Sequence, residues 1–223
     1  MPPAAPSIIF FDAAGTLIHL PRGVGFHYGN VARRHGFEVT DSALDSAFRE
    51  AWKGAPAKPP TRLPRPDDEK EWWRDLVHDV LDRCGAPGHL GRDPFFEELY
   101  LEFARPGVWA LYPEVVEVLE ALRPRHRLGI ISNFDGRLRP ILEEWKLLRF
   151  FEVFVISSEV GSEKPDSWIF ERAAELAGVR PSEALHVGDD PHCVWSGATA
   201  AGMAAFQLDR PRNSLREVLQ FIP

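Results

Sequence analysis

The stretch "IIFFDAAGTLI", residues 8 to 18, decides how the rest of the chain is organised. Four apolar residues run directly into one acid, Asp12, and a glycine and a threonine follow shortly afterwards. A short apolar run that ends in turn residues indicates a strand buried on both faces, as in a parallel sheet. Ligands bind at the carboxyl ends of such strands, so Asp12 is a candidate functional residue. Two positions later, where a second acid could stand in such a loop, the chain has Ala14.

The composition is that of an ordinary globular protein. Hydrophobic residues make up 44% and charged residues 26% of the 223 residues, enough for one large domain or a main domain with a smaller insert. A net charge of −7 argues against a surface that binds nucleic acid. The two cysteines, Cys84 and Cys193, lie far apart and outside metal-finger spacing, which favours a reducing compartment. No stretch is long enough to span a membrane and no secretion signal is evident, so we expect a cytoplasmic protein without a membrane partner.

From Leu111 onward, predicted helices alternate with short apolar strands, which is typical of a parallel sheet covered by helices. The predicted strands are residues 127–132, 151–157, 184–188 and 203–208, and the predicted helices are residues 112–124, 138–146, 165–178 and 191–202.

Between Leu17 and Leu111 the pattern is helical, without strands of comparable apolarity. Helices are predicted for residues 25–37, 40–54 and 71–85, and the proline-rich residues 54–68 are expected to be irregular. The sequence therefore predicts the α/β class: a Rossmann-like parallel sheet core from residues 1–17 and 108–223, with a helical cap inserted as residues 18–107.

Four of the predicted strand ends carry polar side chains. The residues are Asp12 with Thr16, Ser132 with Asn133, Lys164, and Asp189 with Asp190. A nucleophilic carboxylate, a hydroxyl, an ammonium and a further carboxylate suit phosphoryl transfer assisted by a hard cation.

Four motifs then occur in a fixed order: "FFDAAGTLI", "LGIISNFDGRL", "SSEVGSEKPDSWIF" and "ALHVGDDPHCVWSGATAAGM". With them the chain resembles, over nearly its whole length, the haloacid dehalogenase superfamily of aspartate-nucleophile phosphohydrolases, in the subfamily with a helical cap after the first strand. The resemblance implies hydrolysis of a small phosphorylated metabolite.

The resemblance also implies roles for the nucleophile and the metal. Asp12 would attack phosphorus and form an aspartyl-phosphate. The backbone carbonyl of Ala14 and the carboxylate of Asp189 would join Asp12 around Mg²⁺, for which such hard oxygen ligands are suited.

The remaining roles concern the phosphoryl group. Thr16 and Ser132 would donate hydrogen bonds to its oxygens, assisted by backbone N–H groups near Asn133. Lys164 would offset negative charge on the nucleophile and on the phosphoryl group.

Two positions depart from the family pattern. Ala14 stands where phosphatases of this family usually carry an aspartate that protonates the leaving group, and Val194 takes the place of a second acid in the fourth motif. Asp190 is near enough in sequence to compensate in part. The loss at position 14 favours leaving groups that need no proton, such as acyl or aryl phosphates.

Three alternatives stay open from the sequence. A catalytically weak protein that binds a phosphorylated ligand or a protein partner is compatible with Ala14 and Val194. A phosphonoacetaldehyde hydrolase would need a cap lysine, for which Lys53 and Lys58 are available. A 2-haloacid dehalogenase would carry serine and tyrosine where this chain has Asp189 and Phe170. The sequence decides neither the substrate nor whether the chain is a monomer or a dimer.

Overall fold

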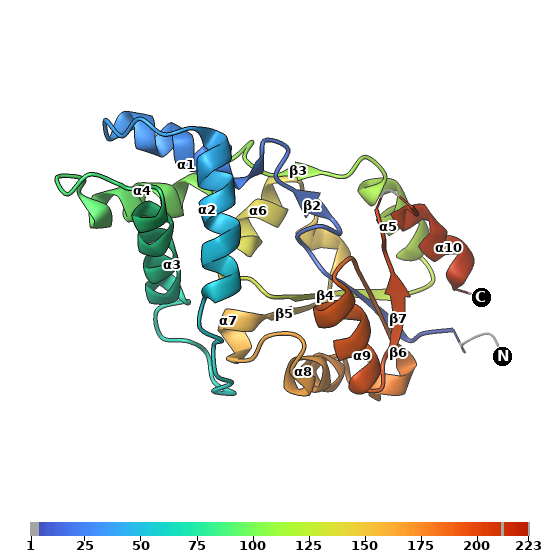
Figure 1. Ribbon diagram of the computed structural model, residues 1–223. Coiled ribbons are helices and arrows are strands. Elements are labelled where there is room, and N and C mark those ends of the chain that lie inside the picture. The colour runs from blue at the N-terminus through green and yellow to red at the C-terminus, as the bar shows by residue number, and fades with distance from the viewer. Residues whose placement is uncertain (1–4, 211, 223) are drawn as a thin grey trace. The chain divides into compact units, whose positions relative to one another are not determined.

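The computed structural model describes residues 5–210 and 212–222. The chain forms two compact units (Figure 1). The core unit comprises Met1–His19, Lys58–Asp68 and Leu111–Pro223, and the helical unit comprises Leu20–Ala57 and Glu69–Ala110.

The core unit is built on a parallel sheet, which among the described residues has five strands in the order β5-β4-β1-β6-β7. The strands are β1 (Ile8–Phe11), β4 (Arg127–Ser132), β5 (Val153–Ile156), β6 (Ala184–Gly188) and β7 (Ala204–Gln207). β1 lies in the middle, pairs with β4 on one side and β6 on the other, and is fully buried along its length. This confirms the predicted α/β class, and β4 and β6 have the predicted bounds.

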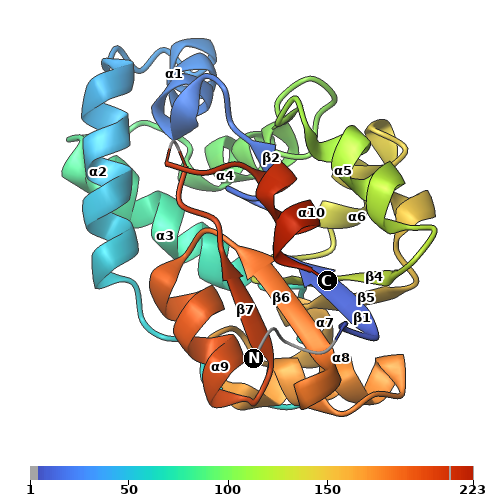
Figure 2. The ribbon, with the colours of Figure 1, turned by 90° about the vertical axis from the view of Figure 1, so that its right-hand side faces the viewer.

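Helices cover both faces of this sheet (Figures 1 and 2). α8 (Ser167–Ala177) and α9 (Gly197–Ala200) lie on one face, and α5 (Val115–Leu122), α6 (Leu138–Glu144) and α10 (Val218–Phe221) on the other. Phe170 of α8 packs in one apolar cluster with Phe10 of β1 and Val155 of β5. Because every strand runs in the same direction, all strand carboxyl ends lie at one edge of the sheet.

Short elements complete the core unit. α7 (Ser157–Val160) directly follows β5, and 3₁₀ turns lie at Leu148–Phe150, Pro181–Glu183 and Leu215–Glu217. β2 (Ile18–His19) pairs with β3 (Ala110–Leu111) in a separate two-stranded sheet. The segment 191–202, predicted as one helix, begins instead as a π-helix at Pro191–Ser196 and continues as α9.

The helical unit has an apolar core of its own. The helices of this unit are α1 (Gly23–Arg34), α2 (Asp41–Gly54), α3 (Lys70–Arg83) and α4 (Arg92–Glu102). Tyr28, Leu44, Val80 and Phe95 belong to one buried cluster, to which each of the four helices contributes. Thr40 caps α2 by accepting a hydrogen bond from the N–H of Ala43 at 3.2 Å, as its position before the helix predicts.

One segment corrects the predicted domain boundaries. Lys58–Asp68 is irregular as expected, but it belongs to the core unit and not to the inserted cap of residues 18–107. The N–H groups of Thr61 and Arg62 both donate to the carbonyl of Gly161, at 2.7 and 3.2 Å. Gly161 has φ +67°, and a Cβ there would lie 2.0 Å from the carbonyl oxygen of Leu63, so only glycine allows this approach.

Asp68 connects the same segment to the loop after β4 and to α7 of the core unit. Its carboxylate accepts the N–H of Gly136 at 2.7 Å and the hydroxyl of Ser158 at 2.5 Å. These charge-assisted bonds explain why the segment folds with the sheet although helices of the other unit flank it in sequence.

None of the helices in residues 5–210 and 212–222 combines the length and the apolarity needed to cross a membrane. Cys84 and Cys193 are both free thiols.

Candidate active site

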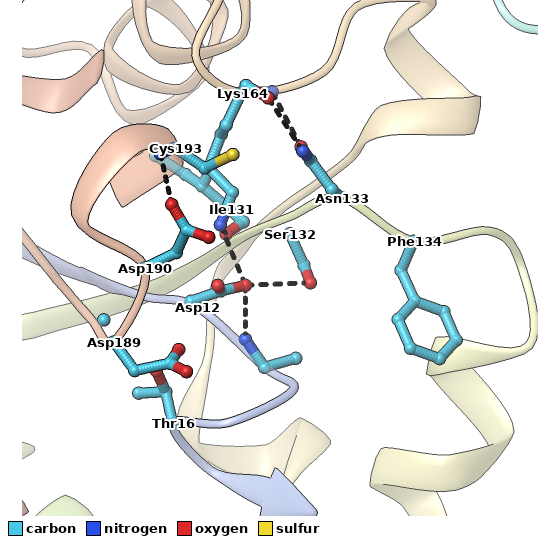
Figure 3. Close-up of polar contacts among 12 residues, drawn as sticks. Asp12, Thr16, Ile131, Ser132, Asn133, Phe134, Lys164, Asp189, Asp190 and Cys193 are labelled. Atoms are coloured by element: carbon cyan, nitrogen blue, oxygen red, sulfur yellow. Dashed lines mark hydrogen bonds and ion pairs between the residues drawn. The ribbon is translucent and has the colours of Figure 1, made fainter. Parts of the chain in front are cut away.

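Asp12 lies at the carboxyl edge of the sheet, directly after the central strand β1, and several polar groups surround it (Figure 3). Its Oδ1 atom accepts hydrogen bonds from the Lys164 ammonium at 2.8 Å, the Ser132 hydroxyl at 3.1 Å and the Ala13 N–H at 2.8 Å. The Asp12 side chain is 13% exposed. The carboxylate is therefore held in one orientation and still open to a ligand.

Lys164 is almost completely buried, with 1% of its side chain exposed. Besides Asp12, its ammonium donates to the carbonyl of Ile131 at 3.1 Å. A buried ammonium is tolerated only when it is paired and hydrogen-bonded, and both conditions hold here. Lys164 thus supplies fixed positive charge beside the predicted nucleophile, where the sequence expected it.

Asn133 connects the loop after β4 with the loop that carries Lys164. Its side-chain oxygen accepts the N–H of Lys164 at 2.7 Å, and its side-chain nitrogen donates to the Lys164 carbonyl at 2.8 Å. The amide side chain is thus used to hold Lys164 in place. The predicted role of Asn133 in phosphate binding would therefore fall to its backbone N–H group, and this role stays a prediction.

Asp189 follows β6 and is the second carboxylate of the site. Its Oδ1 accepts the hydroxyl of the fully buried Thr16 at 3.2 Å. Asp189 also lies directly against Gly15: a Cβ at Gly15, whose φ is +82°, would be 2.2 Å from Oδ2. The glycine of the first motif is therefore needed both for its backbone conformation and for this close approach.

Burial raises the pKa of Asp189, and the negative charge of Asp12 raises it further. Two carboxylates near each other in a partly buried site repel, and a cation between them would relieve that repulsion. The site therefore has the charge pattern expected of a cation-binding site.

The residues present fit Mg²⁺, which prefers oxygen ligands and keeps several of its waters. In the described ranges no group of three or more His, Cys, Asp or Glu side chains could hold a metal ion. Asp12 and Asp189 are the two carboxylates of the site that could hold the ion, and the predicted role of the Ala14 carbonyl as a ligand stays a prediction. Ala14 lies in a tight turn, in which the N–H groups of Leu17 and Ile18 donate to the Ala13 carbonyl at 2.8 and 3.0 Å.

The two positions that depart from the family pattern have defined surroundings. Val194 is fully buried, so it contributes packing where an acid would contribute charge. Asp190 caps the π-helix, because its Oδ1 accepts the N–H groups of His192 at 2.8 Å and Cys193 at 2.5 Å. The Asp190 carboxylate is therefore engaged at the start of this helix.

Sequence reasoning missed two residues near the site. Burial, followed by the charge of Asp190, raises the pKa of the Cys193 thiol to about 12, and the charges of Lys164 and Asp12 are close enough to act on it as well. Arg210 donates to the carbonyl of Thr16 at 3.1 Å. Arg210 follows β7, so the rule that strand carboxyl ends carry the site could have found it.

The structure is thus that of an α/β protein with a Rossmann-like parallel sheet and a buried aspartate, Asp12, at the end of the central strand. A family model for haloacid dehalogenase-like hydrolases matches residues 6–202. The chain belongs to this family, as the four motifs predicted.

Individual proteins agree with this assignment. The haloacid dehalogenase-like hydrolase domain-containing protein 3 of Mus musculus is 35% identical over 201 residues, which cover 89% of this chain and 80% of that protein. The HAD-hydrolase YfnB of Bacillus subtilis, in a structure bound to magnesium, has a TM-score of 0.80 at 14% identity and covers 97% of this chain and 98% of its own. A HAD phosphatase of Thermococcus onnurineus has a TM-score of 0.67 at 22% identity, with 96% of each chain covered. At these identities the two structures show a shared fold.

Proposed function

We propose that the protein is a Mg²⁺-dependent phosphohydrolase that acts on a small phosphorylated metabolite through an aspartyl-phosphate on Asp12. The observation that carries the proposal is the placement of Asp12, whose Oδ1 is held by Lys164 and Ser132 while Asp189 lies close enough to repel it. Such a carboxylate combines a fixed nucleophile with a place for a cation.

The reaction would proceed in two displacements at phosphorus. In the first, an oxygen of Asp12 forms a bond to phosphorus and the bond to the leaving group breaks, with the electron pair leaving on the departing oxygen. In the second, water attacks the same phosphorus, the bond between phosphorus and the Asp12 oxygen breaks, and its electron pair regenerates the Asp12 carboxylate, while the proton of the water leaves with inorganic phosphate or passes to solvent. Mg²⁺, when bound, would neutralise charge on the phosphoryl oxygens.

The residues around Asp12 support both steps. Because three donors hold Oδ1, Oδ2 is the oxygen better placed to attack. The Lys164 ammonium and the Ser132 hydroxyl can also donate hydrogen bonds to the phosphoryl oxygens as negative charge develops on those oxygens. Their fixed placement means that little reorganisation is needed during reaction.

Ala14 limits the substrates that react well. A methyl group cannot donate a proton to a departing alkoxide, and general acid catalysis typically contributes about 10²- to 10⁴-fold. We therefore infer that acyl and aryl phosphates, whose leaving groups are stable anions, react better than alkyl phosphates. Two similar structures support the wider proposal, since one is described as a phosphatase and the other as bound to magnesium.

Steady-state kinetics on acetyl phosphate, p-nitrophenyl phosphate and a sugar phosphate, with and without Mg²⁺, would test this. The unsubstituted protein should hydrolyse the first two only with Mg²⁺, and Asp12→Asn should abolish turnover. Asp82→Asn is the matched control, because the Asp82 side chain is 61% exposed and pairs with Arg92 in the helical unit. Turnover that survives in Asp12→Asn, or that is independent of Mg²⁺, would contradict the proposal.

The second candidate is a protein of the same fold that binds a phosphorylated ligand with little turnover. The absence of acids at Ala14 and Val194 favours it. Orthovanadate, a phosphate analogue, distinguishes the two candidates: Mg²⁺-dependent binding of vanadate without hydrolysis of any substrate would support the binding protein. The phosphonatase alternative is weakened by Lys58, whose ammonium pairs with Glu163 at 3.1 Å in the core unit.

A further inference from the structure

Arg210 lies at the carboxyl edge of the sheet, three residues after β7, and connects two other parts of the core unit. One guanidinium nitrogen, Nη2, donates to the carbonyl of Thr16 at 3.1 Å. The other, Nη1, pairs with the carboxylate of Glu114 at 2.7 Å. The Arg210 side chain is 20% exposed and that of Glu114 only 5%, so water screens this pair weakly.

An aromatic ring fixes the plane of the same guanidinium. Arg210 lies over Tyr112, with its central carbon 3.6 Å from the ring centroid, which is a cation–π contact. Tyr112 also stacks with His19 at 4.5 Å, and its N–H donates to the carbonyl of Leu17 at 3.2 Å. Arg210 is thus anchored on groups that are themselves attached to the turn after β1.

Thr16 connects Arg210 with Asp189, the second carboxylate of the site. Its carbonyl faces Arg210, while its hydroxyl donates to Asp189 Oδ1 at 3.2 Å. Thr16 is fully buried, and Asp189 is in contact with the neighbouring Gly15. A displacement of this turn would therefore displace the Asp189 carboxylate as well.

The geometry points to Arg210 as a positioning residue for the metal-binding carboxylate Asp189, acting through Thr16. The inference rests on the proposed function, in which Asp189 holds Mg²⁺. Because Val194 stands where the family pattern has a second acid, the affinity for Mg²⁺ depends more strongly on how well the remaining carboxylates are oriented. A lysine could not replace Arg210, because one ammonium on a flexible stem cannot make both contacts and stack on Tyr112.

Titration of Mg²⁺ into the protein by calorimetry tests the inference without reference to turnover. Arg210→Gln should weaken Mg²⁺ binding about 10- to 100-fold, the usual effect of removing a group that orients a metal ligand. Thr16→Val, which removes only the hydroxyl, should weaken it comparably and serves as the second variant if Arg210→Gln does not fold. Arg210→Lys should fail to restore the affinity.

Arg212→Gln is the matched control, since Arg212 is 84% exposed and pairs with Asp209 at the surface. Its Mg²⁺ affinity should stay within about twofold of the unsubstituted protein, as expected for an exposed pair. In Arg210→Gln, saturating Mg²⁺ should return kcat to near its original value. A purely structural role would not give this rescue.

The outcomes separate this inference from the proposed function. If the unsubstituted protein binds Mg²⁺ but Arg210→Gln and Thr16→Val bind it equally well, Arg210 has no positioning role. If the unsubstituted protein binds no Mg²⁺, the proposed function fails and the inference fails with it.

Discussion

Replacing Lys164 by methionine should lower the free energy of unfolding by about 3–5 kcal/mol. Methionine nearly fills the volume of the lysine stem but carries no charge. The change leaves Asp12, only 13% exposed, without its ammonium partner. Breaking a buried pair by removing one member is costly because the remaining charge is uncompensated.

The magnitude follows from the geometry of the pair. At the Lys164–Asp12 distance of 2.8 Å, an effective dielectric constant of about 20 gives an attraction of about 6 kcal/mol. The loss of hydration of two nearly buried ions offsets part of that attraction. A net cost of about 3–5 kcal/mol for removing one partner is consistent with both effects.

The loss in the free energy of unfolding is measured by urea unfolding of four proteins: the unsubstituted chain, Lys164→Met, Asp12→Asn and the double variant. The double variant should lose less unfolding free energy than the two single variants lose together, and the difference, the coupling energy, should be about 1–3 kcal/mol. Lys53→Met is the control, because Lys53 forms an exposed pair with Glu50 and should change stability far less than Lys164→Met.

Two results would refute this reasoning. One is a Lys164→Met protein that unfolds at the same urea concentration as Lys53→Met. The other is a cycle without coupling, which would mean that Lys164 and Asp12 do not stabilise each other.

Three further predictions concern the same site. Ala14→Asp should raise kcat/KM on alkyl phosphates about tenfold or more and leave acetyl phosphate turnover nearly unchanged, as steady-state kinetics would show; equal gains on both substrates would contradict it. Gly15→Ala should abolish Mg²⁺ binding in calorimetry and lower the free energy of unfolding by about 1–3 kcal/mol, because its Cβ would lie 2.2 Å from Asp189. Gly202→Ala is the control: Gly202 has φ +84° but no neighbour closer than 3.7 Å, so this variant should retain binding. Asp189→Asn should be more stable than the unsubstituted protein without Mg²⁺ at pH 7, by about 0.5–2 kcal/mol. Burial and Asp12 raise the pKa of Asp189 above 3.8, so its ionisation destabilises the folded state as pH rises above that value, and the difference in Tm should vanish at lower pH.

The local pattern of apolar and polar residues was sufficient to predict the parallel sheet and the polar residues at the ends of its strands. β4 and β6 have the predicted bounds, because a strand buried on both faces needs a mainly apolar run, and such a run is visible locally although β6 includes the buried His186. Asp12 and Asp189 were found by the same reasoning, since each is the first polar residue after such a strand. That both lie at one edge follows from the parallel direction of the strands.

Other features were decided only by the tertiary structure. α4 escaped prediction because its apolar residues do not form one stripe: Phe95, Phe96 and Leu99 are buried, whereas Leu101 is 63% exposed. A helix with this pattern is stabilised by the neighbours that it contacts and not by a local signal.

Long-range hydrogen bonds explain the remaining differences. Asp68 stands in a proline-rich stretch between helices of one unit, yet its carboxylate joins the core unit through Gly136 and Ser158. Arg210 reaches Thr16 across 194 positions of sequence. Contacts between segments so far apart leave no periodic pattern in either segment, because they depend on where the fold brings those segments in space.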